Sequence, residues 1–109
     1  MNGFTNFSDF VMQIVIDEYN ITIFDIKGRS RKKEIREARQ LFTTLLYYHA
    51  YSKYRVTLEQ IGDLVGVGHS TVLHSKDTVV NMIATDINFS NRMDKLQRKA
   101  KEWQRNNQH

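Results

Sequence analysis

Residues 58–74, LEQIGDLVGVGHSTVLH, form two apolar-patterned segments joined by a glycine-containing turn, and this stretch decides the fold that we expect. Thr57 and Gln60 have the spacing of a capping box, in which each side chain satisfies a free N–H at the start of a helix. The apolar side chains of this first helix share one face: Ile61, Leu64 and Val65. The stretch therefore predicts a helix-turn-helix whose second helix opens near His69.

The second segment differs from the first because its polar residues are small. Gly66-Val67-Gly68 provides the positive-φ freedom that a sharp turn needs. At about 100° per residue, a helix over residues 70–83 has an apolar side: Val72, Leu73, Val79, Val80, Met82 and Ile83. The opposite side is polar: Ser70, Thr71, His74, Asp77, Thr78 and Asn81. A face of small polar groups suits insertion into a DNA major groove.

Further helices are expected before this motif. Residues 8–19 form an amphipathic pattern after a cap near Ser8, built from Phe7, Phe10, Val11, Ile14 and Val15. A short helix from Thr22 is expected to end before Gly28. Its side chains predicted to enter the core are Ile23, Phe24 and Ile26. A long helix over residues 34–51 follows, with helical spacing of Ile35, Ala38, Leu41, Phe42, Leu45 and Tyr48.

Residues 85–105 contain a break at 85–88 and then an additional helix. Its apolar residues recur at intervals of four, three, four and three: Phe89, Met93, Leu96, Ala100 and Trp103. This stripe predicts a long packing helix that closes the core. A partner-binding coiled coil is the less favoured alternative, because the stripe is short. Residues 106–109 are expected to be a frayed end.

Tyrosines and basic side chains mix around the end of the long helix: Tyr47, Tyr48, Tyr51 and Tyr54 with His49, Lys53 and Arg55. Such a mixture can stack on exposed bases. We favour the alternative, in which the rings pack and leave their hydroxyls in water.

The length of 109 residues suits one domain that buries its own core, so we expect a single all-α domain over residues 1–109. The chain has no cysteine, and its longest apolar runs are far below the ~20 residues that a membrane helix needs. The opening MNGFTNFSDF lacks the basic and apolar regions of a secretory signal. We therefore expect no membrane association and a cytoplasmic location, at the nucleoid or in a host cell.

Positive charge is concentrated in one segment of the chain. The net charge is +4, yet residues 1–26 hold four acidic and no basic side chains. Residues 27–39 hold seven basic side chains against two acidic ones. A concentrated basic patch is an electrostatic footprint for phosphate, and a solvated charged face is the alternative interpretation.

The sequence does not indicate a catalytic or metal site. It contains no GxxxxGK[ST] phosphate loop. His69 and His74 lie about 140° apart around a helix, so they cannot share a metal as an i, i+4 pair can. We expect a protein that is not an enzyme and uses no cofactor or metal. A small nuclease built on His69 or His74 is the remaining catalytic hypothesis.

Several of these segments resemble the carboxy-terminal DNA-binding domain of the bacterial replication initiator DnaA. The resemblance covers residues 8–84 and includes the basic loop, Ala38-Arg39-Gln40, Ile61-Gly62-Asp63 and His69-Ser70-Thr71-Val72-Leu73-His74. Its most specific part is GHSTVLH, close to the family signature DHTTVLH. The resemblance implies an all-helical fold with a Trp-repressor-like helix-turn-helix that binds short asymmetric boxes in duplex DNA as a monomer.

The resemblance also implies which residues contact DNA. On the second motif helix they are His69, Ser70, Thr71 and His74. Of these, the first two are expected at base edges, Thr71 at a thymine methyl or phosphate, and His74 near the backbone. In the basic loop they are Arg29, Arg31, Lys32 and Lys33, with Arg31 resembling an arginine that enters the minor groove. Near the phosphate backbone they are Arg39, Gln40, Thr57 and Leu58.

Two departures from the family pattern bear on which DNA sequence the protein would recognise. The turn is one residue shorter and lacks the family's Arg and Asp before the histidine. That Asp accepts from a base amino group, and such a contact contributes about 1–3 kcal/mol of discrimination. The link between the long helix and the motif, Tyr51-Ser52-Lys53-Tyr54-Arg55, is also longer. General DNA binding is expected to survive both changes, whereas the family's box cannot be assumed.

We therefore expect sequence-specific binding of double-stranded DNA, with the helix from His69 in the major groove, in replication initiation or transcription regulation. The alternative is a non-catalytic regulatory module that binds a protein of a replication or transcription complex. Origin melting by the initiators uses an ATPase module that this sequence does not contain. We expect a piece of a longer protein or a free-standing relative, for example from a phage or mobile element. Met1 and the acidic start favour the latter.

Overall fold

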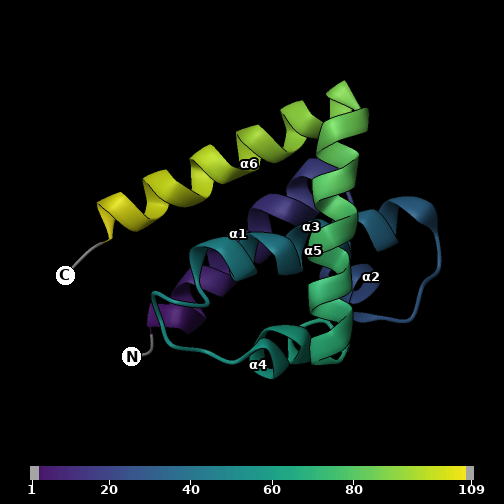
Figure 1. Ribbon diagram of the computed structural model, residues 1–109. Coiled ribbons are helices and arrows are strands. Elements are labelled where there is room, and N and C mark those ends of the chain that lie inside the picture. Colours follow the sequence, from purple (N-terminus) through teal and green to yellow (C-terminus); the bar gives the residue numbers. More distant parts are fainter. Residues whose placement is uncertain (1–2, 108–109) are drawn as a thin grey trace.

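The computed structural model describes residues 3–107, and that part of the chain is all-helical with no strand. The helices are α1 (Gly3–Tyr19), α2 (Ile23–Lys27), α3 (Lys33–His49), α4 (Leu58–Asp63), α5 (His69–Thr85) and α6 (Ile87–Asn106). The all-α prediction is therefore confirmed. In Figure 1, α3 lies behind the upright α5, while α6 crosses the upper end of the molecule.

Helix α3 is the centre of the fold and contacts each of the other helices. Every residue from 41 to 46 is buried, so this part of the helix is enclosed on all sides. The buried Thr43 hydroxyl donates to the carbonyl oxygens of Arg39 and Gln40, both at 3.2 Å. A helix enclosed in this way can fix the position of the elements around it, including both parts of the helix-turn-helix.

Helix α1 begins at Gly3, earlier than the predicted cap at Ser8, so that prediction is wrong. Ser8 is buried inside the helix, and its hydroxyl donates to the Thr5 carbonyl at 3.1 Å. The extra turn is stabilised by packing, because Phe4 is buried and its ring centroid lies 6.3 Å from that of Tyr54. Tertiary contacts of this kind, rather than local propensity, stabilise most helical turns.

Helix α2 forms where it was predicted, but it directs one apolar side chain inward instead of three. Ile26 is fully buried, whereas Ile23 is 39% exposed and Phe24 is 84% exposed. The helix has five residues and starts with a capping box between Thr22 and Asp25. A helix that short presents a single position to its neighbour, so the prediction for Ile23 and Phe24 is wrong.

Helix α5 also buries a narrower stripe than the sequence predicted. Val72, Ser75 and Val79 are buried, while Leu73 is 37% exposed and Val80 is 45% exposed. The buried positions follow one face, three and four residues apart, which is the face that packs on α3. Helix α5 contacts α3, α4 and α6, and these three helices together leave Leu73 and Val80 exposed. The apolar side predicted for this helix is therefore only partly buried, and Leu73 and Val80 lie on its exposed part.

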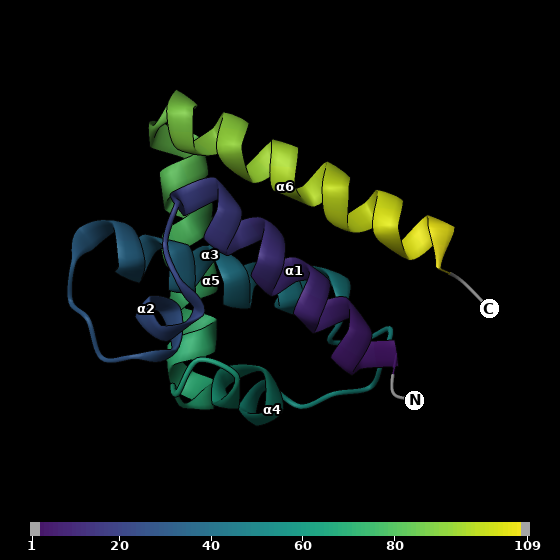
Figure 2. The same cartoon turned by 180° about the vertical axis from the view of Figure 1, so that it is seen from behind.

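Helix α6 closes the core as predicted. Phe89, Met93, Leu96 and Ala100 are buried, and Trp103 stacks on Phe10 with ring centroids 5.6 Å apart. Figure 2 shows α6 lying along α1 from the side opposite to Figure 1. The helix continues to Asn106, so the predicted frayed end is wrong at that residue. Residues 108 and 109 lie outside the described residues.

A polar network also joins α1, α3 and α6. Arg92 pairs with Glu18 at 3.3 Å and with Glu37 at 3.0 Å, and Lys95 pairs with Glu18 at 2.7 Å. The hydrogen bond from Lys95 holds the pKa of the Glu18 carboxyl below its usual value. Tyr19 donates its hydroxyl hydrogen bond to Glu37, and burial raises the pKa of that hydroxyl. The network fixes one end of α6 against the first helix.

Candidate nucleic-acid interface

The helix-turn-helix begins with the predicted capping box. Gln60 N–H donates to the Thr57 hydroxyl oxygen at 3.0 Å, and Thr57 N–H donates to the Gln60 side-chain oxygen at 2.7 Å. Ile61 is fully buried and fixes α4 to the core. The capping prediction is therefore confirmed, and α4 starts at Leu58, beside the residues predicted to lie near phosphate.

The turn between α4 and α5 depends on two glycines with different functions. Gly66 has φ +71°, the left-handed conformation that glycine adopts without a steric penalty. Gly62 allows close approach, because a Cβ there would lie 2.2 Å from the Val67 carbonyl oxygen. The N–H groups of Val65 and Val67 both donate to the Gly62 carbonyl at 3.0 Å. The predicted positive-φ turn is confirmed at Gly66, whereas Gly68 has φ −81° and caps α5.

The start of α5 presents an exposed polar face. His69, Ser70, Thr71 and His74 are all exposed, as the DNA-binding prediction requires. Gly68 provides no side-chain cap for the first turn of this helix. The Ser70 hydroxyl lies 3.5 Å from the His69 ring nitrogen, and this contact is between exposed neighbours. The side chains are therefore accessible to a base edge, and their contact with DNA stays a prediction.

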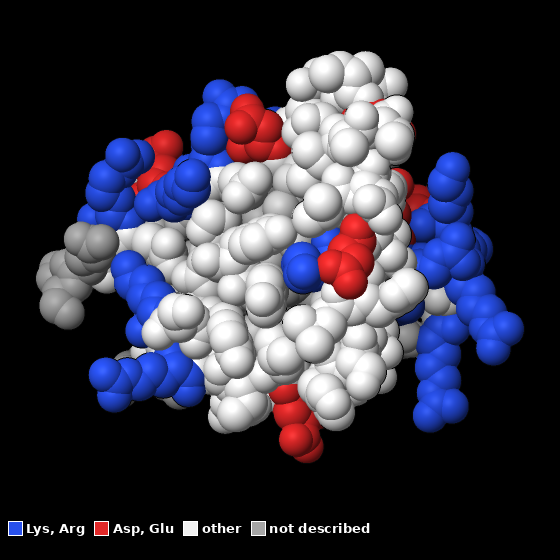
Figure 3. All heavy atoms as spheres, viewed as in Figure 1, with Lys and Arg blue, Asp and Glu red and all other residues white. Residues whose placement is uncertain are grey.

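The basic loop lies between α2 and α3, next to this face. Arg29, Arg31, Lys32 and Lys33 are exposed. Across residues 3–107, none of these four side chains forms an ion pair with a carboxylate. Figure 3 shows Lys and Arg side chains gathered at the right edge, where Figure 1 places this loop. Their charge is therefore available to an external anion.

Arg39 holds the basic loop from inside. Its guanidinium donates to the carbonyl oxygens of Ile26 at 2.8 Å, Gly28 at 3.1 Å and Ser30 at 3.5 Å. Burial lowers the pKa of this guanidinium from its ordinary value. The sequence predicted a phosphate contact for Arg39, but its donors point to the loop backbone. Arg39 therefore positions the loop backbone in the structure, and its contact with phosphate stays a prediction.

A small cavity joins α3 to the exposed face of α5. Its volume is about 230 Å³, and it brings Gln40 together with Thr71 and His74. Gln40, predicted near phosphate, and two residues predicted to contact DNA therefore share one surface. Arg36 also lines this cavity and was not predicted as a site residue. Its place one helical turn before Gln40 was the signal that could have identified it.

A second cavity, of about 650 Å³, lies at the start of α5. It places His69 beside Thr57 and Leu58, so the predicted backbone contacts adjoin the first residue of α5. Arg55 lines the same cavity, although the sequence had assigned it only to a mixture of aromatic and basic residues. The structure thus adds Arg55 to the residues around the candidate interface.

The tyrosines around the end of α3 divide into two groups. Tyr54 packs inward, with its ring centroid 5.7 Å from that of Phe7, as predicted. Tyr47 stacks on Tyr51 at 5.6 Å, and Tyr48 is 48% exposed. The packing prediction is therefore met fully by Tyr54, while the others make contacts among themselves at the surface.

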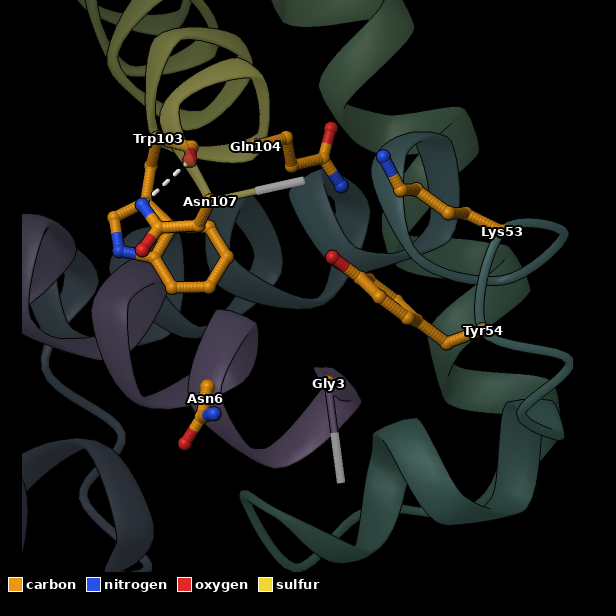
Figure 4. Close-up of a pocket in the computed structure, with 7 residues that line it drawn as sticks. All are labelled: Gly3, Asn6, Lys53, Tyr54, Trp103, Gln104 and Asn107. Atoms are coloured by element: carbon orange, nitrogen blue, oxygen red, sulfur yellow. Dashed lines mark hydrogen bonds between the residues drawn. The ribbon is translucent and has the colours of Figure 1, made fainter. Parts of the chain in front are cut away.

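The most voluminous of these cavities, about 690 Å³, lies away from the helix-turn-helix. Figure 4 shows it between the start of α1, the loop after α3 and the end of α6. Tyr54 and Trp103 line it, together with none of the residues predicted to bind DNA. Among residues 3–107, no three His, Cys, Asp or Glu side chains lie together so that they could hold a metal ion. In the same part of the chain, no helix has the length and apolarity to cross a membrane.

Comparison with known proteins relates this geometry to one family. The family model described as "Bacterial dnaA protein helix-turn-helix" matches residues 8–79. A protein of Crocosphaera subtropica, "Chromosomal replication initiator protein DnaA", is 32% identical over 97 residues, covering 88% of this chain and 20% of that protein. The protein of the same name from Flavobacterium psychrophilum is 30% identical over 92 residues, covering 84% of this chain and 18% of that protein. The chain thus spans about a fifth of the length of these relatives.

Proposed function

The chain belongs to the bacterial DnaA helix-turn-helix family, which supports DNA binding, and from that membership we propose that it recognises a specific sequence in double-stranded DNA. The observation that carries this proposal is the exposed polar face of α5 beside a basic loop without internal ion pairs. The polar face of α5 supplies groups that can contact base edges, and the basic loop supplies positive charge for phosphate.

In the proposed complex, the start of α5 enters the major groove. His69 and Ser70 meet base edges, and Thr71 meets a thymine methyl or phosphate. The basic loop lies on the backbone, with Arg31 in the adjacent minor groove. Gln40 and His74 lie near phosphate from one side, and Thr57 and Leu58 from the other. Phosphate contacts supply most of the affinity, and the chain binds as a monomer.

The biological setting follows from the relatives, which are named chromosomal replication initiators. We propose that the chain binds sites at a replication origin or a promoter. Because it corresponds to about a fifth of those proteins, the proposal is confined to DNA recognition and includes no strand opening. It includes no catalysis.

Selection of bound duplexes from a random pool tests sequence recognition and identifies the site together. The selected duplex is then titrated in fluorescence anisotropy at physiological salt, against a scrambled duplex of equal length. Specific binding is expected to exceed nonspecific binding by a factor of about 10³ or more. Pools that yield no common sequence, with a Kd no tighter than ~10⁻⁴–10⁻⁶ M, would contradict the proposal. That result would favour a regulatory module that binds protein.

The basic loop is tested with Lys32→Ala combined with Lys33→Ala. Each lost phosphate contact is expected to reduce the slope of log K against log salt by about 0.9. The double variant should therefore bind all duplexes more weakly with a shallower slope. Ser70→Ala is the matched comparison, because it should relax sequence preference and leave the slope unchanged. An unchanged slope in the double variant would remove the basic loop from the interface.

A further inference from the structure

The link between α3 and α4 approaches the start of α5 from the side away from the basic loop. In both Figure 1 and Figure 2, the link between α3 and α4 and the basic loop lie on opposite sides of α4 and the start of α5. A helix in the major groove lies between two phosphate backbones, one along each edge of a groove about 12 Å wide. A basic group in the link would therefore face the backbone that the basic loop does not reach.

Arg55 is held at the surface of this link by its two neighbours. The Tyr54 ring packs on Phe7, and Tyr54 N–H donates to the Ala50 carbonyl at 2.9 Å. On the other side, Val56 is buried at 8% exposure. Because both neighbours are anchored in the core, the exposed Arg55 side chain has a defined place on the surface.

The backbone of Arg55 is unusual for a residue with a side chain. Its φ is +55°, in the left-handed region that glycine occupies freely. For residues with a Cβ this conformation is sterically disfavoured. Glycine fits this backbone conformation, so replacing Arg55 by glycine removes the guanidinium without straining the link.

The Arg55 guanidinium is unpaired among the described residues. No carboxylate among residues 3–107 forms an ion pair with Arg55. Its side chain lines the cavity of about 650 Å³ that it shares with His69, the first residue of α5. Glu59 is the acidic residue of that cavity lining. An unpaired cation therefore adjoins the residue proposed to meet the first base edge.

We propose that Arg55 binds a phosphate of the DNA backbone on the side opposite the basic loop. The extended link thus adds a second electrostatic arm to the helix-turn-helix. This inference rests on the proposed DNA binding. Because phosphate carries no base information, Arg55 strengthens binding to every duplex and does not select the site.

The test compares Arg55→Gly with Arg55→Lys. Glycine removes the charge and suits the left-handed backbone, so this variant should melt at the wild-type temperature or above. Affinity for a mixed-sequence duplex is measured by anisotropy over a series of KCl concentrations. Arg55→Gly is expected to weaken binding and reduce the slope of log K against log salt by about 0.9. Arg55→Lys is expected to keep the wild-type slope.

Lys101→Gln is the charge control, because Lys101 is exposed on α6 and should leave the slope unchanged. Arg55→Gln repeats the charge removal if the glycine variant does not fold. A steep wild-type slope that both neutral variants retain would overturn this inference and leave the proposed function intact. An equal loss in Lys101→Gln would also overturn it. A wild-type protein that does not bind duplex DNA would overturn the proposed function, and with it this inference.

Discussion

Gly62 shows how a missing side chain can determine a whole motif. A Cβ at this position would lie 2.2 Å from the Val67 carbonyl, a backbone atom that cannot rotate away. Gly62→Ala is therefore expected to destabilise the protein by about 1–3 kcal/mol, the range for overpacking. Urea unfolding monitored by circular dichroism measures this change. Gly68→Ser is the control, because a Cβ at Gly68 meets no atom within 4 Å and its stability should change little. Equal stability of the two variants would contradict the argument.

Gly68 offers a prediction about specificity. It is the N-cap of α5, and in GHSTVLH it takes the place of the Asp in the DHTTVLH signature that this segment resembles. Gly68→Asp should be accommodated without a clash and should give a base amino group an acceptor. Preference for adenine or cytosine at one position is expected to rise by about 1–3 kcal/mol. Selection from a random pool measures the change, with Gly68→Asn as the uncharged cap. If both variants select the wild-type site, a side chain at position 68 does not face a base.

Among the elements, the basic loop depends on Arg39 for its shape. Arg39→Lys keeps the charge but cannot reproduce a forked donor to several carbonyls. We expect faster amide exchange over residues 28–32 and weaker binding to all duplexes. Hydrogen exchange followed by mass spectrometry and anisotropy measure these effects. Arg105→Lys, at an exposed position near the end of α6, should behave as wild type. If Arg39→Lys binds and exchanges as wild type does, Arg39 contacts phosphate directly or has no function in the loop.

The elements that the sequence predicted correctly depend on short-range patterns. The capping box at Thr57 and the stripe of α6 can be read from spacing alone, because the interacting groups lie within a few turns. Burial on α2 and α5 could not be read in this way. It depends on which neighbour covers each face, and Phe24 and Val80 face solvent because no helix covers them. The inward direction of Arg39 is equally a tertiary result, since its acceptors lie 9 to 14 residues away.

For the candidate site, the sequence predicted residue types better than positions. The polar face of α5 and the basic loop followed from composition and from the family signature, and both are exposed in the structure. Arg55 was not predicted, because its importance depends on the path of the link between α3 and α4. That path is fixed by Tyr54 in the core and by the capping box at Thr57. Sequence spacing contains no direct record of either long-range constraint.

At the scale of the whole molecule, His49 connects the end of α3 to α6. Its ring nitrogen lies 3.1 Å from the Gln97 side-chain oxygen, and its carbonyl accepts from Gln104 at 2.7 Å. Burial lowers the pKa of His49 from its usual value of 6.5. The folded state therefore prefers the neutral ring, whereas the unfolded state takes up a proton below pH 6.5. The neutral His49 ring therefore contributes fully to the free energy of unfolding above pH 6.5. This contribution is lost as the pH falls toward the lowered pKa of His49.

The free energy of unfolding is accordingly expected to decrease as the pH falls from 7.5 through the region below the usual histidine pKa of about 6.5. His49→Gln should flatten this decrease, because glutamine does not titrate. Urea unfolding at a series of pH values measures the effect. His74→Gln, at an exposed position on α5, is the matched control for replacing a histidine by glutamine. The Glu18 carboxyl affects stability over a lower pH range. Its pKa is lowered from 4.5, so its contribution to the free energy of unfolding is lost only under more acidic conditions. If His49→Gln retains the full decrease above that pH range, then the contact between α3 and α6 is not the pH-sensitive part of the fold.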